Sequence, residues 1–280
     1  IYNFWSSPVS GATWSSVWGT GYNSADWYQF DESIQDFTGY GTSTAMNTGE
    51  GYAMTGLTGG GANTVSFTGT PHNGTYNVSL YYNGDGNSDN DYNLVGNPYP
   101  SAIDANSFTS ANSDISGTLW FWDRNLSGLN VTPDYSTWTS SGGTAGSAGG
   151  AIPGDFIASC QGFMTQALAG TSIDFTNAQR TSGNNSQFYK QGDDISRMWL
   201  LAESDNQGWN QILVAFTDGA TDGYDRLYDG KKLKGNPNIA FYSKLNGDDY
   251  AIQALAPLNG QSKSVPLGLD AGKAGTYTIA

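Results

Sequence analysis

Tyr76-Asn77-Val78-Ser79-Leu80-Tyr81-Tyr82 is the stretch that decides the fold class of this chain. Until its last pair, large side chains alternate with small polar ones, which is the two-residue period of a half-buried β-strand. Strand-like runs of this kind recur between turn residues at 65–68, 118–122, 156–159, 197–202, 211–216, 250–255 and 275–279. Helical periodicity is weak, and one short turn of helix is expected near Ser101–Phe108, where Asp104 or Ser107 would cap it. We therefore predict an all-β chain.

Length and composition favour two domains with many turns. The chain has 280 residues and 38 Gly, and its acidic residues are 22 Asp against only 3 Glu, a bias toward turn-forming residues. The sequence becomes polar around residues 179–194, which indicates a domain junction. We expect two tandem β-sandwich domains of jelly-roll or Ig-like type with long Gly/Asn/Asp-rich loops, at 1–182 and 183–280, the second of them truncated.

Charge and cysteine content exclude several functions. The formal net charge is −14, so nucleic acid and anionic membranes would be repelled, while cations would be attracted. The sequence has no apolar run long enough for a membrane span, which predicts no membrane insertion. A single Cys and a single His leave neither an intrachain disulfide nor a Cys/His zinc site. Cys160 is expected to be a small buried apolar residue.

One acidic loop has the composition of a calcium site. In the run 83–91, oxygen-bearing side chains alternate along a turning segment, as Ca²⁺ requires. The predicted ligands are Asp85, Asn87, Asp89 and Asp91, with calcium as the cofactor. The spacing is not that of an EF-hand, because Asn90 and Gly96 occupy the positions of its invariant Gly and Glu. The alternative is a solvated hairpin loop between strands at 76–82 and 92–96.

A second acidic cluster comprises Asp218, Asp222, Asp225 and Asp229, interleaved with Arg226, Lys231 and Lys232. It is interpreted as a charge-balanced surface loop in which Asp225 or Asp229 bonds to backbone. Metal binding there is the alternative.

Catalytic patterns are weak. A glycosidase needs two carboxyl groups at a defined separation, one of them with a raised pKa. Asp31, Glu32, Asp123 and Asp134 are candidates, but nothing in the sequence singles out a pair. The one histidine, His72, lies in a turn, and no Gly-x-Ser-x-Gly motif accompanies it. The sequence therefore predicts a protein that is not an enzyme.

Aromatic residues offer a binding function instead. Trp14, Trp18, Trp27 and Trp138 stand in polar, loop-like surroundings, where exposed rings would stack on sugars. Trp18 and Trp138 are the predicted ligand-binding residues.

A set of motifs spread in order along the whole chain resembles one known family. They are YNFWSSPV (2–9), FTGTPHNG (67–74), NLVGNPYPSAID (93–104), LWFWD (119–123), QGF (161–163), Arg180 with QFY (187–189), ATDGYD (220–225), YDGKKL (228–233), VPLG (265–268) and AGTYTI (274–279). The chain resembles the region that precedes the C-terminal sorting domain in surface proteins of Bacteroidota exported by type IX secretion. The family carries no catalytic residues in this region. Cys160 departs from its pattern, since a small residue or Gly is expected before Gln161.

Together these observations predict a non-catalytic structural or adhesive module of a secreted, cell-surface protein, cut from a longer exported chain and located outside the cell. Surface glycans or other surface proteins are the expected partners. The first alternative is a carbohydrate-binding module that uses exposed aromatics, and the second is part of a secreted hydrolase.

Overall fold

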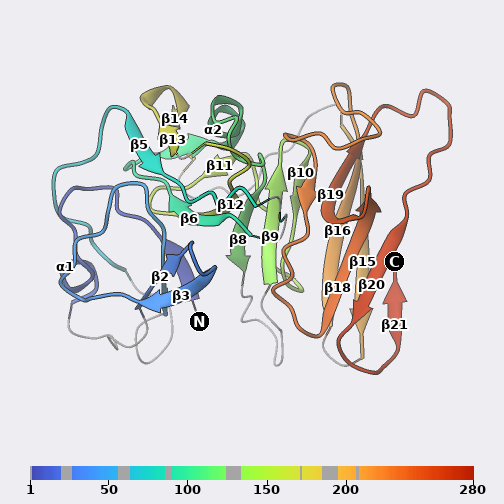
Figure 1. Ribbon diagram of the computed structural model, residues 1–280, viewed down its shortest axis with the longest axis horizontal. Coiled ribbons are helices and arrows are strands. Elements are labelled where there is room, and N and C mark those ends of the chain that lie inside the picture. Colours follow the sequence, from blue (N-terminus) through green and yellow to red (C-terminus); the bar gives the residue numbers. More distant parts are fainter. Residues whose placement is uncertain are drawn as a thin grey trace. The chain divides into compact units, whose positions relative to one another are not determined.

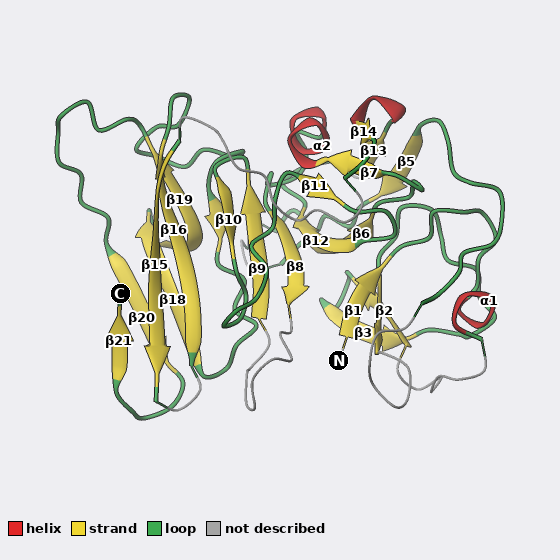
Figure 2. Ribbon diagram, turned by 180° about the vertical axis from the view of Figure 1, so that it is seen from behind, coloured by secondary structure: helices red, strands yellow, loops and turns green. Residues whose placement is uncertain are grey.

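The computed structural model describes residues 2–19, 27–55, 64–85, 87, 90–123, 134–170, 172–184, 195–205 and 208–280 (Figures 1 and 2). Strands dominate it. Its helices are the short α1 (Trp14–Trp18) and α2 (Ala105–Ala111) and the 3₁₀ helix η2 (Asn177–Gln179). The all-β prediction is confirmed. Neither α-helix in the described part of the chain is long and apolar enough to cross a membrane.

The chain divides into two compact units, each built from two separate segments. Unit 1 comprises residues 1–116 and 156–187, and unit 2 comprises residues 117–155 and 188–280. The predicted boundary after residue 182 lies near the second crossing between the units. The assignment of 117–155 to the N-terminal domain is corrected, because their strands pack with the C-terminal ones. Residues 117–155 join unit 2 through contacts with strands far along the chain, and no local turn signal in the sequence predicts such contacts.

The described residues of unit 1 form four groups of paired strands. One sheet has the order β1-β4-β2-β3, another has β11-β7-β14, β13 pairs with β5, and β12 pairs with β6. The strands are β1 (Tyr2–Trp5), β2 (Trp27–Asp31), β3 (Asp36–Gly39), β4 (Tyr52–Thr55), β5 (Tyr76–Ser79), β6 (Tyr92–Gly96), β7 (Ala102–Asp104), β11 (Phe156–Ile157), β12 (Gly162–Gln166), β13 (Ser172–Phe175) and β14 (Arg180–Thr181).

The hairpin expected between 76–82 and 92–96 is wrong. β5 pairs with β13, and β6 pairs with β12, so the two neighbouring runs each take a partner from far along the chain. The strand signal in each run was sound, but pairing depends on contacts that a local pattern does not encode.

A proline-rich elbow after β6 organises unit 1. Pro98 and Pro100 exclude helix there, and the buried Asn97 fills the bend. Its Nδ2 donates to the carbonyls of Ser101, Ile157 and Ala158, and its Oδ1 accepts from the Tyr99 N–H. The elbow therefore ties β6 to the end of β11 and to the residue that follows it. The predicted cap is also present, since Asp104 accepts from the Ser107 N–H at the start of α2.

Tryptophans form the interior of the N-terminal part of unit 1. The Trp14 ring stacks on Trp27 at 5.0 Å, lies 4.5 Å from the Trp18 ring and meets Tyr52 edge-on. In α1 the apolar residues Trp14, Val17 and Trp18 are spaced i, i+3, i+4, so they share one buried face while the serines between them are exposed. Large aromatic surfaces packed in this way stabilise the unit strongly.

Unit 2 combines an antiparallel three-stranded ladder with a large mixed sheet. The ladder contains β8 (Leu119–Asp123), β9 (Asp134–Thr139) and β10 (Gly142–Thr144). The sheet has the order β20-β18-β19-β16-β15-β21 with β17 on β19. Figures 1 and 2 label its six longer strands. Its strands are β15 (Ser196–Ser204), β16 (Trp209–Phe216), β17 (Gly230–Lys231), β18 (Ile239–Leu245), β19 (Asp248–Leu255), β20 (Leu267–Ala271) and β21 (Tyr277–Ile279).

Two apolar clusters lie among the described residues of unit 2. One joins Leu213 and Ala215 of β16 to Ile252 and Ala254 of β19, and the other gathers Ala202, Ile212, Ile239 and Phe241. Gly142 of β10 approaches Leu213 so closely that an added Cβ would lie 3.2 Å from its side chain. The ladder therefore packs on the large sheet within unit 2. The jelly-roll or Ig-like type of each unit stays a prediction.

Candidate functional site

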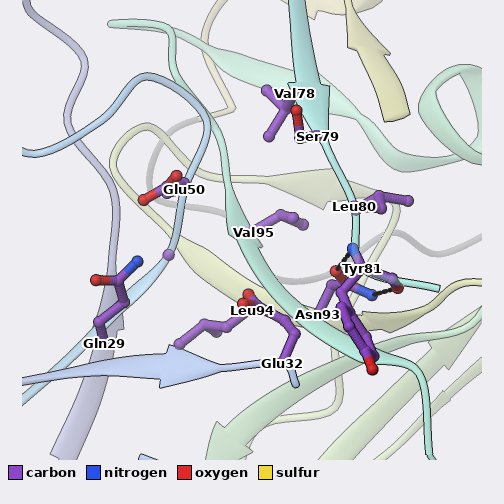
Figure 3. Close-up of a pocket in the computed structure, with 11 residues that line it drawn as sticks. Gln29, Glu32, Glu50, Val78, Ser79, Leu80, Tyr81, Asn93, Leu94 and Val95 are labelled. Atoms are coloured by element: carbon purple, nitrogen blue, oxygen red, sulfur yellow. Dashed lines mark hydrogen bonds between the residues drawn. The ribbon is translucent and has the colours of Figure 1, made fainter. Parts of the chain in front are cut away.

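A pocket of about 260 Å³ lies within unit 1 and gathers two of the three glutamates of the chain. Figure 3 shows Gln29, Glu32 and Glu50 around one side of it, Val78, Ser79, Leu80 and Tyr81 along the other, and Val95 between them. Its lining residues are Gln29, Glu32, Glu50, Gly51, Val78, Ser79, Leu80, Tyr81, Asn93, Leu94 and Val95. Pockets for drug-sized ligands measure about 300–1,000 Å³, so this one fits a small molecule or the end group of a larger one.

Glu50 reaches the pocket because glycines flank it. Gly49 adopts φ +79°, and a Cβ on Gly51 would lie 2.7 Å from both Leu94 Cγ and the Val95 carbonyl oxygen. These close approaches allow Gly51 N to donate to the Leu94 carbonyl at 2.9 Å and Gly96 N to donate to the Gly49 carbonyl at 2.9 Å. The Gly49-Glu50-Gly51 turn is thereby fastened to β6.

The carboxylate of Glu50 is held on one of its oxygens. Its Oε2 accepts from the Tyr52 hydroxyl at 2.9 Å and from Asn47 Nδ2 at 3.0 Å. Burial and the charge of Glu50 raise the pKa of Tyr52 well above its usual range, so this hydroxyl remains a donor at all physiological pH values. The side chain is thus oriented rather than free to rotate.

Glu32 enters the pocket just beyond the end of β2. Gln35, which has φ +55°, donates to the Glu32 carbonyl at 2.6 Å and also bonds both the N–H and the carbonyl of Tyr92. Gln35 therefore clamps the Glu32 backbone onto β6. Burial raises the pKa of the Glu32 carboxyl, its own backbone N–H opposes the rise, and the charge of Glu50 raises it further.

The opposite wall is positioned by Asn93. Its Oδ1 accepts from the Tyr81 N–H at 2.7 Å, and its Nδ2 donates to the Tyr81 carbonyl at 3.0 Å, so the side chain imitates a strand partner (Figure 3). This holds Val78, Leu80 and Tyr81 against β6. The pocket therefore combines two carboxylates and two carboxamides with aliphatic walls, the usual composition of a small-ligand site.

The aromatic site predicted from the sequence is wrong. Trp18 is 7% exposed and Trp138 is 0% exposed, so neither presents a face to a sugar. Trp18 packs in the aromatic interior of unit 1, and Trp138 lies in β9, where its Nε1 donates to Asp155 Oδ1 at 3.2 Å. Polar neighbours misled the prediction, because in β9 even the serine and threonine side chains are buried.

The predicted calcium loop is partly described, with Asp89 outside the described residues. Asp85 accepts from the Asn87 N–H at 2.7 Å and from the Asn83 side chain, and the buried Asp91 accepts from the Asn83 N–H at 2.6 Å. Among the described residues, no group of three or more His, Cys, Asp or Glu side chains is placed to hold a metal ion. Calcium binding by Asp85, Asn87, Asp89 and Asp91 stays a prediction.

The second acidic cluster follows its structural interpretation in part: Asp225 and Asp229 bond to backbone as expected, but Asp229 is completely buried and does not lie in a surface loop. Asp225 accepts from the Thr221 N–H, Asp229 accepts from the N–H groups of Asp225 and Ala254, and Asp222 pairs with Lys263. Their carboxylates are therefore occupied in closing the loop.

Of the four acids considered for hydrolysis, only Glu32 lines the pocket. Asp31 accepts from Ser33, Asp123 from Ser136 and Ser147, and Asp134 belongs to a buried ion pair in unit 2. Sequence reasoning missed Glu50. The signal available was its position between two glycines, as one of three Glu among 22 Asp.

A family model described as a domain of unknown function (DUF8693) matches residues 1–280. No curated protein and no solved structure matches the chain significantly.

Proposed function

We propose that this chain, which belongs to that family over its whole length, is a non-catalytic adhesive module of a secreted cell-surface protein, with the pocket of unit 1 as its recognition site. The observation that carries the proposal is the pocket itself, in which two carboxylates, that of Glu50 held by hydrogen bonds, meet two carboxamides and aliphatic walls. Such a mixture recognises a small polar group with an apolar flank.

The way other buried acids are used supports a non-catalytic role. Asp134 accepts from Tyr135, Asn210, Lys232 and Gly235, and Asp229 accepts from two backbone N–H groups. These carboxylates stabilise loops and strands within unit 2, which suits a durable extracellular scaffold. The resemblance to exported surface proteins and the acidic net charge support the same location.

A glycan-array screen of the purified chain, run in calcium and again in chelator, tests the proposal. We expect binding by the native chain and by Glu203→Gln, whose side chain is exposed on β15, and loss of binding by Glu50→Gln. If the native chain binds no glycan under either condition, the proposed glycan-binding function is wrong. Labelling of intact cells with an antibody against the chain tests its surface location.

A second candidate function is glycoside hydrolysis, and the raised pKa of Glu32 beside Glu50 favours it. A retaining or inverting enzyme uses one protonated and one ionised carboxyl group. Incubation of the chain with each glycan that it binds, followed by analysis of the products, separates the two functions. Binding without cleavage is expected, and turnover abolished by Glu32→Gln would establish the hydrolase instead.

A further inference from the structure

We propose that the pocket of unit 1 binds a sugar through a protonated amino group, so that the ligand is an amino sugar with a free ammonium; this rests on the proposed recognition function of the same pocket. The inference rests on the negative charges of Glu32 and Glu50 and on the scarcity of positively charged side chains in the rest of unit 1.

Unit 1 is almost devoid of cations. Its two segments contain eleven Asp and Glu side chains but a single Lys or Arg, Arg180. Arg180 is engaged elsewhere: its guanidinium lies 5.0 Å from the centre of the Tyr99 ring and donates to Ser101, Asn73 and Asn177. Hence no cation of unit 1 is available to neutralise the acids of the pocket.

The two pocket carboxylates therefore repel each other without compensation from within the unit. Burial and the charge of Glu50 both disfavour the ionised form of Glu32. Oε2 of Glu50 is occupied by Tyr52 and Asn47, whereas Oε1 has no donor among the described residues. An ammonium group supplies both the missing charge and up to three N–H donors, and a charge-assisted bond of this kind is roughly twice as strong as a neutral one.

The remaining lining favours a sugar over a simple amine. Gln29 and the exposed Ser79 offer polar groups at the wall, where ring hydroxyls would bond. The apolar surface open to a ring is that of Tyr81, which is 37% exposed, and the nearly buried Val78, Leu80, Leu94 and Val95 form the wall behind it. Polar contacts together with an apolar face match the amphipathic surface of a pyranose.

Titration of the full chain with D-glucosamine near neutral pH, followed by NMR, tests the proposal. D-glucose and N-acetyl-D-glucosamine are the matched probes, because they keep the ring and lack the charge. We expect glucosamine to bind at least about tenfold more tightly than either, which corresponds to one favourable charge contact of about 1.4 kcal/mol. Nα-acetyl-lysine amide is the probe for a bare ammonium, and it is expected to bind more weakly than glucosamine.

Variants locate the site. Glu50→Gln and Glu32→Gln keep the side-chain shape and should each weaken glucosamine binding at least about tenfold, whereas Glu203→Gln should leave it unchanged. An unchanged melting temperature for Glu32→Gln, whose carboxylate bonds no side chain in the described region, excludes unfolding as the cause.

The outcomes separate this inference from the proposed function. Equal binding of glucose or N-acetylglucosamine, abolished by Glu50→Gln, would overturn the ammonium inference and leave glycan recognition intact. Equal or tighter binding of the lysine derivative would overturn the sugar assignment. Glucosamine binding that survives both pocket substitutions would overturn the site, and absence of any sugar binding would overturn both proposals.

Discussion

Lys232 Nζ lies 2.9 Å from Asp134 Oδ2, and both side chains are almost completely buried in unit 2. The same carboxylate oxygen accepts from Asn210 Nδ2, and Oδ1 accepts from the N–H groups of Tyr135 and Gly235. Asp134 therefore joins β9, β16 and the segment before β18 through a single side chain.

Removal of one member of this pair should be severe. Lys232→Ala leaves a buried, uncompensated carboxylate, and the loss of one partner of a buried pair costs about 3–5 kcal/mol. The control is Lys234→Ala, which removes half-exposed pairs with Asp249 and Asp270 and should cost no more than about 1 kcal/mol. Urea denaturation of both variants measures the free energies of unfolding. Similar values for the two variants would contradict the stronger contribution of the buried Lys232–Asp134 pair.

Asp229 should make stability depend on pH near neutrality. Burial raises the pKa of its carboxyl to about 7, the N–H groups of Asp225 and Ala254 oppose the rise, and the charge of Asp225 adds to it. Because the folded-state pKa is raised above the ordinary value of 3.8, the folded chain binds the proton more tightly than the unfolded chain. This contribution to stability is full below about pH 4 and is lost as the pH rises through 7.

Denaturation curves recorded between pH 5 and pH 8 test whether the stability contributed by Asp229 falls as the pH rises. Relative to the native chain, Asp229→Asn should have lower stability, since its carboxamide has one acceptor for two backbone donors, and a smaller decline with rising pH. The hydroxyls of Tyr224 and Tyr250, whose pKa values are raised by burial, stay protonated over this range. An identical pH slope in both proteins would refute the role of Asp229.

Gly51→Ala should damage the pocket specifically. The new Cβ would overlap the Leu94 side chain and the Val95 carbonyl at 2.7 Å, which forces a rearrangement costing about 1–3 kcal/mol. Gly39→Ala in β3 is the matched control, because nothing lies within 4 Å of its Cβ position. Thermal melts should show a lower melting temperature only for Gly51→Ala, together with weaker ligand binding.

Cys160 should tolerate glycine better than valine. Its backbone has φ +64°, in the left-handed region that favours Gly and penalises β-branched residues. This agrees with the expectation that a small residue or Gly belongs before Gln161. The free energy of unfolding of Cys160→Val should be at least about 1–2 kcal/mol below that of Cys160→Gly. The reverse order would show that packing of the thiol outweighs the backbone strain.

The calcium prediction has a direct test. If the loop 83–91 holds Ca²⁺, addition of chelator lowers the melting temperature of the native chain, and Asp85→Ala with Asp89→Ala abolishes the difference. Asp218→Ala, in the second acidic cluster, serves as the control. A melting temperature that does not respond to chelator would show that the predicted calcium site is wrong.

Local features were the predictable part of this fold. The alternation at 76–82, the proline elbow and the capping role of Asp104 depend on residues close in sequence, and all three are present. The helical spacing of Trp14, Val17 and Trp18 was equally local but was obscured by the serines between them. A polar neighbourhood is poor evidence of exposure in a chain whose interior contains many serines and threonines.

Long-range features were not predictable. The pocket brings together β2, the turn before β4, the end of β5 and β6, and it exists because β5 and β6 pair with strands about 70–100 residues away. Neither glutamate is marked by a motif, since their relation arises only when Gln35 and the glycines around Glu50 attach both turns to β6.

The interleaving of the two units constrains how the protein is made. During synthesis from the N-terminus, β5 and β6 emerge long before β12 and β13, and the first strands of the other unit are translated in between. The hydrogen bonds of Asn97 likewise form only after Ile157 and Ala158, which supply two of the accepting carbonyls, have been synthesised. Unit 1 therefore cannot mature cotranslationally as an early, independent body, and no single proteolytic cut or cloning boundary separates the chain into its two folded parts.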